Sequence, residues 1–200
     1  MADQTAREQR TEERLRRILA AARDRADVDG WSAVTTRHLA DAIGYSQPVL
    51  YSHFPGGKAE IMLAIALEGF VDFTLACRAA LGQKHGRPAI EAVANAYLDF
   101  GTQHPAIYEA MFQQPIDTRF ASDDTSPELR AAFLVLSDAV ADQSGGATTE
   151  VFWGMLHGIS LLERSGRMRP EHRAARIAEL GQRFTTDPAR LPTTPSNSAG

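Results

Sequence analysis

Apolar residues recur at helical spacing along most of the chain, and the alternating runs of Val, Ile and Thr that mark β-strands are nearly absent. Prolines, glycines and capping residues divide this pattern into about nine segments. The pattern therefore predicts an all-α protein, with helices over residues 11–29, 36–43, 47–53, 57–82, 88–103, 105–114, 126–143, 149–165 and 170–184.

Local signals set the expected starts of the first helices. Thr11, Thr35 and Ser46 each precede a helical segment, and their hydroxyl groups can cap its N-terminus. Pro48 lies in the first turn of the third segment, where a missing N–H group costs nothing.

Three segments lack helical periodicity. Residues 1–10 are charged and are expected to form a flexible arm, and residues 115–126 are expected to form a loop. Residues 185–200 are rich in Pro, Ser and Thr, so we expect a disordered tail.

Composition limits the classes of function that the chain can have. It contains a single cysteine, Cys77, so an intrachain disulfide is impossible. No apolar run is long enough to cross a membrane, and the N-terminus has no apolar stretch of the signal-peptide type. We therefore expect a cytoplasmic protein without a membrane partner.

The sequence also lacks the motifs of common enzymes and metal sites. Its six histidines show no H-x-x-x-H or H-E-x-x-H spacing, and one cysteine cannot form a metal-binding pair. No G-x-S-x-G, P-loop or dinucleotide glycine fingerprint occurs. We expect no catalytic residues, no metal, no cofactor and no enzymatic activity.

The net charge of −4 is unevenly distributed along the chain. Residues 1–60 contain nine Arg or Lys and nine Asp or Glu, whereas the other 140 residues contain 12 basic and 16 acidic groups. Nucleic-acid-binding domains are usually basic, so any contact with DNA must depend on where individual charges lie.

Two short helical segments, 36–43 and 47–53, have the pattern of a helix-turn-helix. Leu39 and Ile43 fall on the inner face of the first, and Gly44 permits the left-handed conformation that begins the turn. Ala40 is small enough for the helices to cross closely, and the small core is expected to be closed by Tyr45, Val49 and Leu50.

The side chains left on or near the outer face are types that read DNA. Gln pairs with an adenine edge, Arg with a guanine, and the apolar faces of Pro and Tyr suit a thymine methyl group. Ser, Tyr, Thr and Lys also bind phosphates and fix the register on the duplex. The outward residues are Ser46, Gln47, Pro48, Tyr51 and His53.

The stretch "TTRHLADAIGYSQPVLYSHFPGGK", residues 35–58, closely resembles the DNA-binding segment of TetR-family regulators. The resemblance implies an N-terminal three-helix DNA-binding domain, here residues 11–56. It also implies a long helix that joins this domain to a larger helical part for ligand binding and dimerisation, here residues 57–184.

The resemblance also implies roles for individual residues. Thr36 is expected to contact phosphate and Arg37 to reach a guanine, while Gln47, Pro48 and Tyr51 are expected in the major groove. His53 is expected near the DNA backbone. Lys58, at the start of the long helix, is expected to bind phosphate, although the extra glycine in "FPGGK" could shift it relative to the groove.

Aromatic residues concentrate in the part that the resemblance assigns to a ligand. Five segments contribute large apolar side chains, and Tyr97, Tyr108 and His157 add polar groups, as in a mainly apolar pocket. Aromatic residues at helical spacing also build ordinary cores. The candidate ligand-binding residues are Phe70, Phe73, Tyr97, Phe100, Tyr108, Met111, Phe112, Phe133, Trp153 and His157.

The segment "VFWGMLHGISLLERSG" is the candidate dimer interface, together with residues 170–184. Gly154 and Gly158 are four residues apart and permit a close approach between helices. The W-x-x-x-H-G pattern resembles the corresponding helix of some TetR-family C-terminal domains. Leu161 and Leu162 complete the expected interface.

The sequence thus predicts a ligand-responsive, homodimeric transcriptional regulator, most simply a repressor. It would bind a palindromic operator in double-stranded DNA and be released by a small-molecule effector. Activation in place of repression leaves no trace in the sequence. The alternative is a helical protein-interaction or lipid-binding module that keeps a helix-turn-helix core without specific DNA reading.

Overall fold

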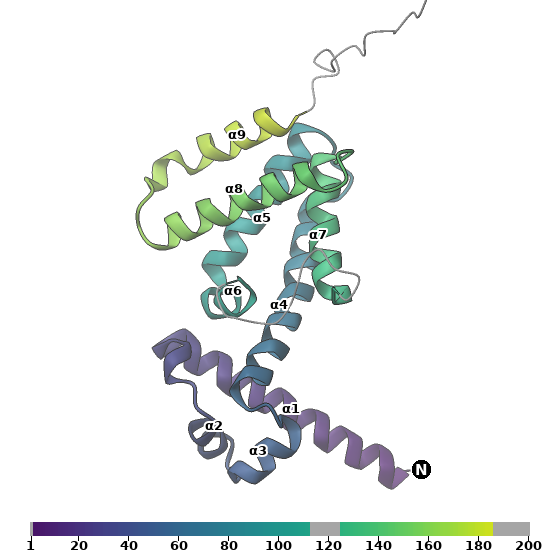
Figure 1. Ribbon diagram of the computed structural model, residues 1–200, viewed down its shortest axis with the longest axis vertical. Helices are drawn as coiled ribbons and strands as arrows, with labels where there is room; N and C mark the ends of the chain where they lie inside the picture. Colours follow the sequence, from purple (N-terminus) through teal and green to yellow (C-terminus); the bar gives the residue numbers. More distant parts are fainter. Residues whose placement is uncertain (1, 113–124, 186–200) are drawn as a thin grey trace, which may run out of the picture. The chain divides into compact units, whose positions relative to one another are not determined.

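The computed structural model describes residues 2–112 and 125–185, and this part of the chain contains nine α-helices and two short 3-10 helices (Figure 1). The predicted all-helical fold is confirmed. Within the described residues no helix is both long and apolar enough to span a bilayer. The elements are α1 (Ala2–Asp29), η1 (Trp31–Ala33), α2 (Thr36–Ile43), α3 (Gln47–His53), α4 (Lys58–Leu81), α5 (Arg87–Gln103), α6 (Pro105–Phe112), α7 (Pro127–Val140), α8 (Ala147–Arg164), η2 (Pro170–His172) and α9 (Arg173–Phe184).

The first helix begins much earlier than predicted. α1 starts at Ala2, so residues 2–10 are helical and do not form an arm. Thr11 does not cap a helix, because its hydroxyl donates to the carbonyl of Arg7 inside α1 at 3.0 Å. Residues 2–10 contain neither Gly nor Pro, and nothing interrupts the helix that the following residues nucleate.

Two segments lie mostly outside the described residues. These are the predicted loop at 115–126, of which only 125 and 126 are described, and the predicted tail at 185–200, of which only 185 is described. The two 3-10 helices were not predicted, because three residues are too few to produce a recognisable periodicity.

The helices form two compact units, and each boundary between them falls inside a helix. One unit comprises Met1–Ala76 and Asp99–Phe133, and the other comprises Cys77–Leu98 and Leu134–Gly200. This grouping places α6 in the same unit as the helix-turn-helix.

A close crossing of α4 and α6 organises the core of the first unit. A Cβ atom on Gly69 would lie 2.5 Å from Ile107 and 2.8 Å from the sulfur of Met111, so only glycine fits there. Beside this crossing, the Phe70 and Phe112 rings meet edge-to-face with centroids 5.4 Å apart. Such pairs add about 0.5–1.5 kcal/mol beyond area burial.

The second unit is built on the buried face of α8. Phe152 and Leu156 are fully buried, and the Phe152 ring packs against Phe184 of α9 at 4.9 Å between centroids. α9 also lies close to α5, since a Cβ atom on Gly181 would be 2.8 Å from the side chain of Glu91.

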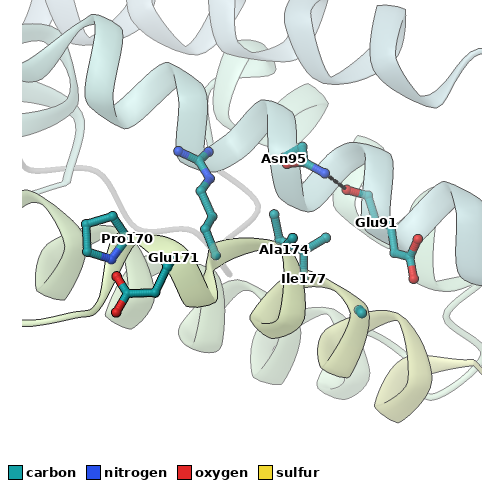
Figure 2. Close-up of a pocket in the computed structure, with 8 residues that line it drawn as sticks. Glu91, Asn95, Pro170, Glu171, Ala174 and Ile177 are labelled. Atoms are coloured by element: carbon teal, nitrogen blue, oxygen red, sulfur yellow. Dashed lines mark hydrogen bonds between the residues drawn. The ribbon is translucent and has the colours of Figure 1, made fainter.

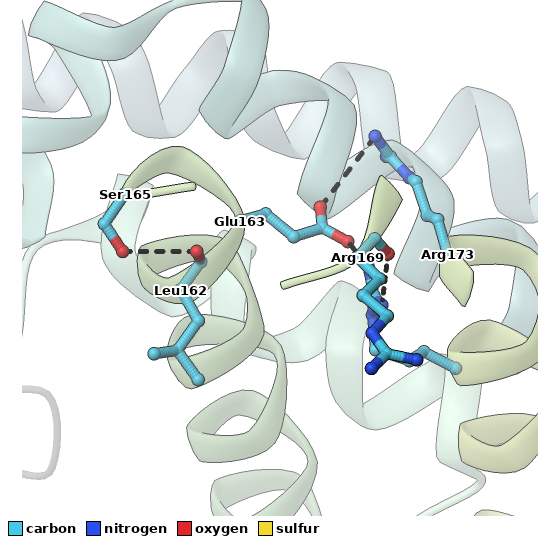
Figure 3. Close-up of polar contacts among 6 residues, drawn as sticks. Leu162, Glu163, Ser165, Arg169 and Arg173 are labelled. Atoms are coloured by element: carbon cyan, nitrogen blue, oxygen red, sulfur yellow. Dashed lines mark hydrogen bonds and ion pairs between the residues drawn. The ribbon is translucent and has the colours of Figure 1, made fainter. Parts of the chain in front are cut away.

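Glu163 joins the end of α8 to α9 through a shielded ion pair (Figure 3). Its carboxylate lies 2.5 Å from Arg176 and 3.9 Å from Arg173, and the Glu163 and Arg176 side chains are only 14% and 18% exposed. Arg176 also donates to the carbonyl of Arg169 at 3.0 Å. Glu163 lies at the C-terminal end of α8, and the fold of α9 back onto α8 covers it.

We predict that Glu163→Gln destabilises the protein, because it leaves a shielded arginine without its countercharge. Fully buried pairs cost about 3–5 kcal/mol to break, and exposed pairs about 0–1 kcal/mol. For this shielded pair we expect a loss of about 1–3 kcal/mol in the free energy of unfolding, measured by urea denaturation.

The matched control is Glu179→Gln. Glu179 pairs with Arg183 at a similar distance, 2.6 Å, but these side chains are 53% and 63% exposed. The free energy of unfolding of this variant is expected to stay within about 0.5 kcal/mol of that of the unsubstituted protein. Equal losses in the two variants would contradict the importance of shielding.

Candidate nucleic-acid interface

The turn between α2 and α3 has the predicted geometry. The Thr35 hydroxyl accepts from the His38 N–H at 3.1 Å and caps α2. Gly44 ends α2 in the left-handed region, with φ 73° and ψ 33°, where a side chain would be strained. Ser46 occupies the N-cap position of α3 as expected, but the predicted hydroxyl cap is wrong, because the Ser46 side chain forms no cap hydrogen bond.

A small apolar core holds the two helices together. Leu39 and Leu50 are completely buried and Ile43 is nearly so, as predicted. These contacts stabilise α3, which at seven residues is too short to be stable by itself.

The outer face of this unit exposes several of the predicted DNA-reading side chains. Ser46, Gln47, Pro48 and Arg37 are exposed, and Tyr51 is 44% exposed. Tyr51 is also held in place, because its hydroxyl lies 3.4 Å from that of Thr36 and its ring would be 3.4 Å from a Cβ atom on Gly57. Thr36 and Tyr51, fifteen residues apart, therefore lie together.

Two predicted phosphate-side residues already have contacts within the protein. The Lys58 ammonium donates to the carbonyl of Trp31 at the start of η1. His53 Nε2 lies 3.3 Å from the guanidinium of Arg14. Burial, followed by the positive charge of Arg14, lowers the pKa of His53. Both side chains thus help to fix α3 and α4 against the elements that precede them.

Sequence reasoning missed a cluster of arginines beside the turn. The guanidinium carbons of Arg14 and Arg17 lie 4.8 and 5.7 Å from the centre of the Tyr45 ring, and Arg17 donates to the carbonyl of Ile43 at 2.9 Å. Tyr45, expected in the core, is instead half-buried beneath these cations. The spacing of Arg14 and Arg17 on one face of α1 was the available signal.

Comparison with known families places this geometry in context. Residues 18–65 match the family model described as bacterial regulatory proteins of the tetR family. Residues 90–184 match the model of a tetracyclin repressor-like C-terminal domain. The chain belongs to the TetR family of transcriptional regulators.

Curated relatives are also transcriptional regulators. The chain is 31% identical over 153 residues to the uncharacterised HTH-type transcriptional regulator Rv0681 of Mycobacterium tuberculosis, covering 71% of this chain and 66% of Rv0681. It is 26% identical to the uncharacterised regulator YobS of Bacillus subtilis, covering 72% and 76% of the two chains. It is 28% identical to the HTH-type transcriptional activator FasR of Mycolicibacterium smegmatis, covering 66% and 58%. The chain thus spans just under two thirds of Rv0681 and less of FasR.

Solved structures share the fold. A Rhodococcus sp. RHA1 protein of unknown function aligns with a TM-score of 0.70 at 20% identity, covering 86% of this chain and 96% of that one. The TetR-family regulator PfmR of Thermus thermophilus aligns with a TM-score of 0.58 at 20% identity, covering 84% and 94%.

Membership of the TetR family establishes a transcriptional regulator with a DNA-binding helix-turn-helix and a helical C-terminal domain. The family is not one of enzymes, as expected. In the part of the chain that the structure describes, no group of three or more His, Cys, Asp or Glu side chains is arranged to hold a metal ion.

The ten aromatic and apolar residues expected around a TetR ligand do not all belong to one compact unit. The second unit contains three of them. The Trp153 indole N–H donates to the Tyr97 hydroxyl at 3.2 Å. His157 lies one turn further along α8, and burial, followed by the positive charge of Arg164, lowers its pKa. The first unit contains the other seven, and several of these rings pack on one another: Phe70, Phe73, Phe100, Tyr108, Met111, Phe112 and Phe133.

A surface hollow of about 510 Å³ lies between α5 and α9 in the second unit. Figure 2 shows Glu91 and Asn95 of α5 facing Ala174 and Ile177 of α9, with Glu171 of η2 at one end. This hollow is more polar than the expected pocket and includes none of the ten predicted residues.

The four predicted dimer residues lie on an open part of α8. A Cβ atom on Gly154 or Gly158 would have no neighbour within 4 Å. Leu161 and Leu162 are 38% and 37% exposed. Val151, which was not predicted, is 59% exposed and lies one turn before Gly154 on the same face.

We predict that Arg14→Gln raises the pKa of His53 towards its ordinary value of 6.5, because it removes the positive charge beside the ring. Burial remains, so the return is incomplete. Titration of the His53 ring by NMR measures the change, and Arg16→Gln, which alters an arginine paired with Glu12 and Glu13, is the control.

The same shift makes stability depend on pH. The lowered pKa means that folded His53 binds fewer protons than unfolded His53, so its contribution to the free energy of unfolding falls as the pH drops below about 6.5. Arg14→Gln should reduce this loss. An unchanged His53 pKa and an unchanged acid slope in Arg14→Gln would contradict the prediction.

Proposed function

We propose that this TetR-family protein is a homodimeric repressor that reads a palindromic operator through α3 and is released by a small, mainly apolar effector. In this proposal residues 11–56 read DNA and residues 57–184 bind the effector and dimerise. The observation that carries it is the exposed, rigidly supported outer face of α3.

DNA reading is assigned to the predicted side chains on that face. Gln47 presents an amide that can pair with an adenine edge, and Pro48 offers an apolar surface to a thymine methyl group. Tyr51, held against Thr36 and Gly57, meets the groove with little loss of side-chain freedom. Arg37 reaches a guanine, and Ser46 and Thr36 contact phosphate.

His53 and Lys58 take a modified role in the proposal. Each side chain retains donor capacity besides its internal contact, so each can bind phosphate while still fixing its helix.

Dimerisation is assigned to the open face of α8. Val151, Gly154, Gly158 and the two leucines follow one another at helical spacing, and the glycines let a second helix approach closely. A two-fold axis at such a contact makes the interface self-complementary, and reading successive major grooves requires two α3 helices about 34–36 Å apart.

The first unit supplies a route from an effector to α3. The Trp31 indole N–H donates to the Ala106 carbonyl at 2.9 Å, and the Ala106 N–H donates to Asp27 at 3.2 Å. These bonds tie α6 to α1 and η1. Because α6 carries Tyr108, Met111 and Phe112, an effector that displaces those side chains would move the attached helix-turn-helix.

Release then follows as a population shift. The effector must prefer the state that does not fit the operator, and a coupling free energy of about 1–3 kcal/mol is typical. The relative FasR is named an activator. Activation by this chain would need the same DNA reading and would differ in where the operator lies.

We predict that Gln47→Ala and Tyr51→Ala each weaken operator binding by about 5- to 150-fold for each half-site, which corresponds to about 1–3 kcal/mol per reading side chain. The operator is obtained by selecting bound duplexes from a random pool, and affinity is measured by fluorescence anisotropy. Ser52→Ala is the matched control, because its exposed hydroxyl is bonded back to the Val49 carbonyl.

The same experiment separates the proposal from a protein-interaction or lipid-binding module. DNA binding through phosphates weakens steeply with salt, whereas apolar association does not. Failure to enrich any duplex at low salt would overturn the DNA-reading proposal.

We predict that Leu161→Glu with Leu162→Glu produces a folded monomer, because two carboxylates would have to be desolvated in the proposed interface. Sedimentation equilibrium measures the mass, and circular dichroism checks the helices. Val28→Glu, at an apolar position of α1 that is 80% exposed, is the control and should remain dimeric. A double variant that keeps the dimer mass would show that another surface dimerises.

A further inference from the structure

The N-terminal half of α1 carries a stripe of arginines. Arg7, Arg10, Arg14 and Arg17 follow at spacings of three, four and three residues, which places them on one face of the helix. Arg14 is half-buried and the other three are exposed. Figure 1 shows the N-terminal end of α1 running past α3.

Contacts at the inner end of the stripe fix the direction in which it faces. Arg14 meets His53 at the end of α3, Arg17 donates to the carbonyl of Ile43 at the end of α2, and both cover Tyr45. A helix rises 1.5 Å per residue, so Arg10 and Arg7 lie about 6 and about 10 Å further along the same face. They extend the helix-turn-helix surface beyond α3.

Two carboxylates near the stripe are already paired. Glu12 and Glu13 form ion pairs with Arg16 at 3.7 and 3.5 Å. No carboxylate among the described side chains forms an ion pair with Arg7 or Arg10. A surface hollow of about 690 Å³ lies along α1 here, and its lining includes Arg10, Arg14 and Arg17 of the stripe as well as the paired Glu12, Glu13 and Arg16.

We propose that Arg7 and Arg10 bind the phosphate backbone of the duplex beside the segment that α3 reads, so that each protomer needs a longer operator than α3 alone would require. This proposal rests on the DNA reading proposed above. One guanidinium group can donate two hydrogen bonds to the oxygens of one phosphate, and such contacts position the protein on the duplex without reading its sequence. Arg14 and Arg17 hold the stripe in place through Tyr45 and the helix ends.

The test is the salt dependence of operator binding by the full chain. Each phosphate contact contributes about 0.9 to the slope of log affinity against log salt concentration. Arg7→Gln with Arg10→Gln removes up to two such contacts from each protomer, so it should reduce the magnitude of that slope by about 2–4 for the dimer, and should weaken binding to operator and to unrelated duplex by the same factor. Arg16→Gln, in the same helix but paired with glutamates, should leave the slope unchanged.

A second variant separates charge from structure. Glutamine, lysine and arginine all favour helices, so neither substitution should unfold α1. Arg7→Lys with Arg10→Lys keeps the charge and should keep most of the slope. On a duplex trimmed to the segment read by α3, the parent and the Gln variant should bind alike, because the flanking phosphates are gone.

The outcomes distinguish this inference from the function it rests on. If the unsubstituted protein enriches no duplex, both the role of the arginine stripe and DNA reading by α3 are overturned. A parent that binds its operator, with a Gln variant of equal slope on the full-length duplex, overturns the role of the arginine stripe and leaves DNA reading by α3 standing. If the Lys variant shows the same reduction in the salt slope as the Gln variant, the role of the arginine stripe is likewise overturned, because the cause would then be structural.

Discussion

The first unit depends on one buried residue, Trp31, whose indole N–H and carbonyl both have partners on other elements. The indole N–H donates to Ala106 of α6, and the carbonyl accepts from Lys58 at the start of α4. Asp27, just before it in α1, accepts the Ala106 N–H. A buried donor or acceptor that loses its partner costs about 1–3 kcal/mol. Separating α1, α4 or α6 would therefore leave several such groups unpaired at once.

That constraint matters for DNA reading because α3 is too short to hold its own position. It is fixed by Leu50 in the core, by the Gly44 turn and by the contact of His53 with α1. The supports of α3 are thus the same elements that Trp31 ties to α6. In the proposed effector response, this connection lets a rearranged α6 alter the exposed face of α3 without touching it.

Charge in this protein acts locally. The first 60 residues are neutral as a whole, yet α1 carries a stripe of arginines in addition to Arg16, which is balanced by Glu12 and Glu13. In the second unit, a single carboxylate is surrounded by arginines. Glu163 of α8 pairs with Arg173 and Arg176 of α9 and is shielded from solvent. Net charge would have revealed neither feature, because each depends on which charges share a helix face or a crossing.

Much of the fold was determined by the sequence alone. The periods of α2 and α3, the Thr35 cap and the left-handed Gly44 are local properties, and local steric and hydrogen-bonding rules predicted them correctly. The start of α1 was missed, because a charged helix without breakers looks the same as a charged arm until its neighbours stabilise it. Tertiary structure alone decided that Tyr45 lies beneath Arg14 and Arg17, that Lys58 bonds to η1 and that Trp31 reaches α6. The two residues in each of these contacts are separated by 27 to 75 positions in the sequence. Whether they meet depends on how the helices pack, which no local pattern records.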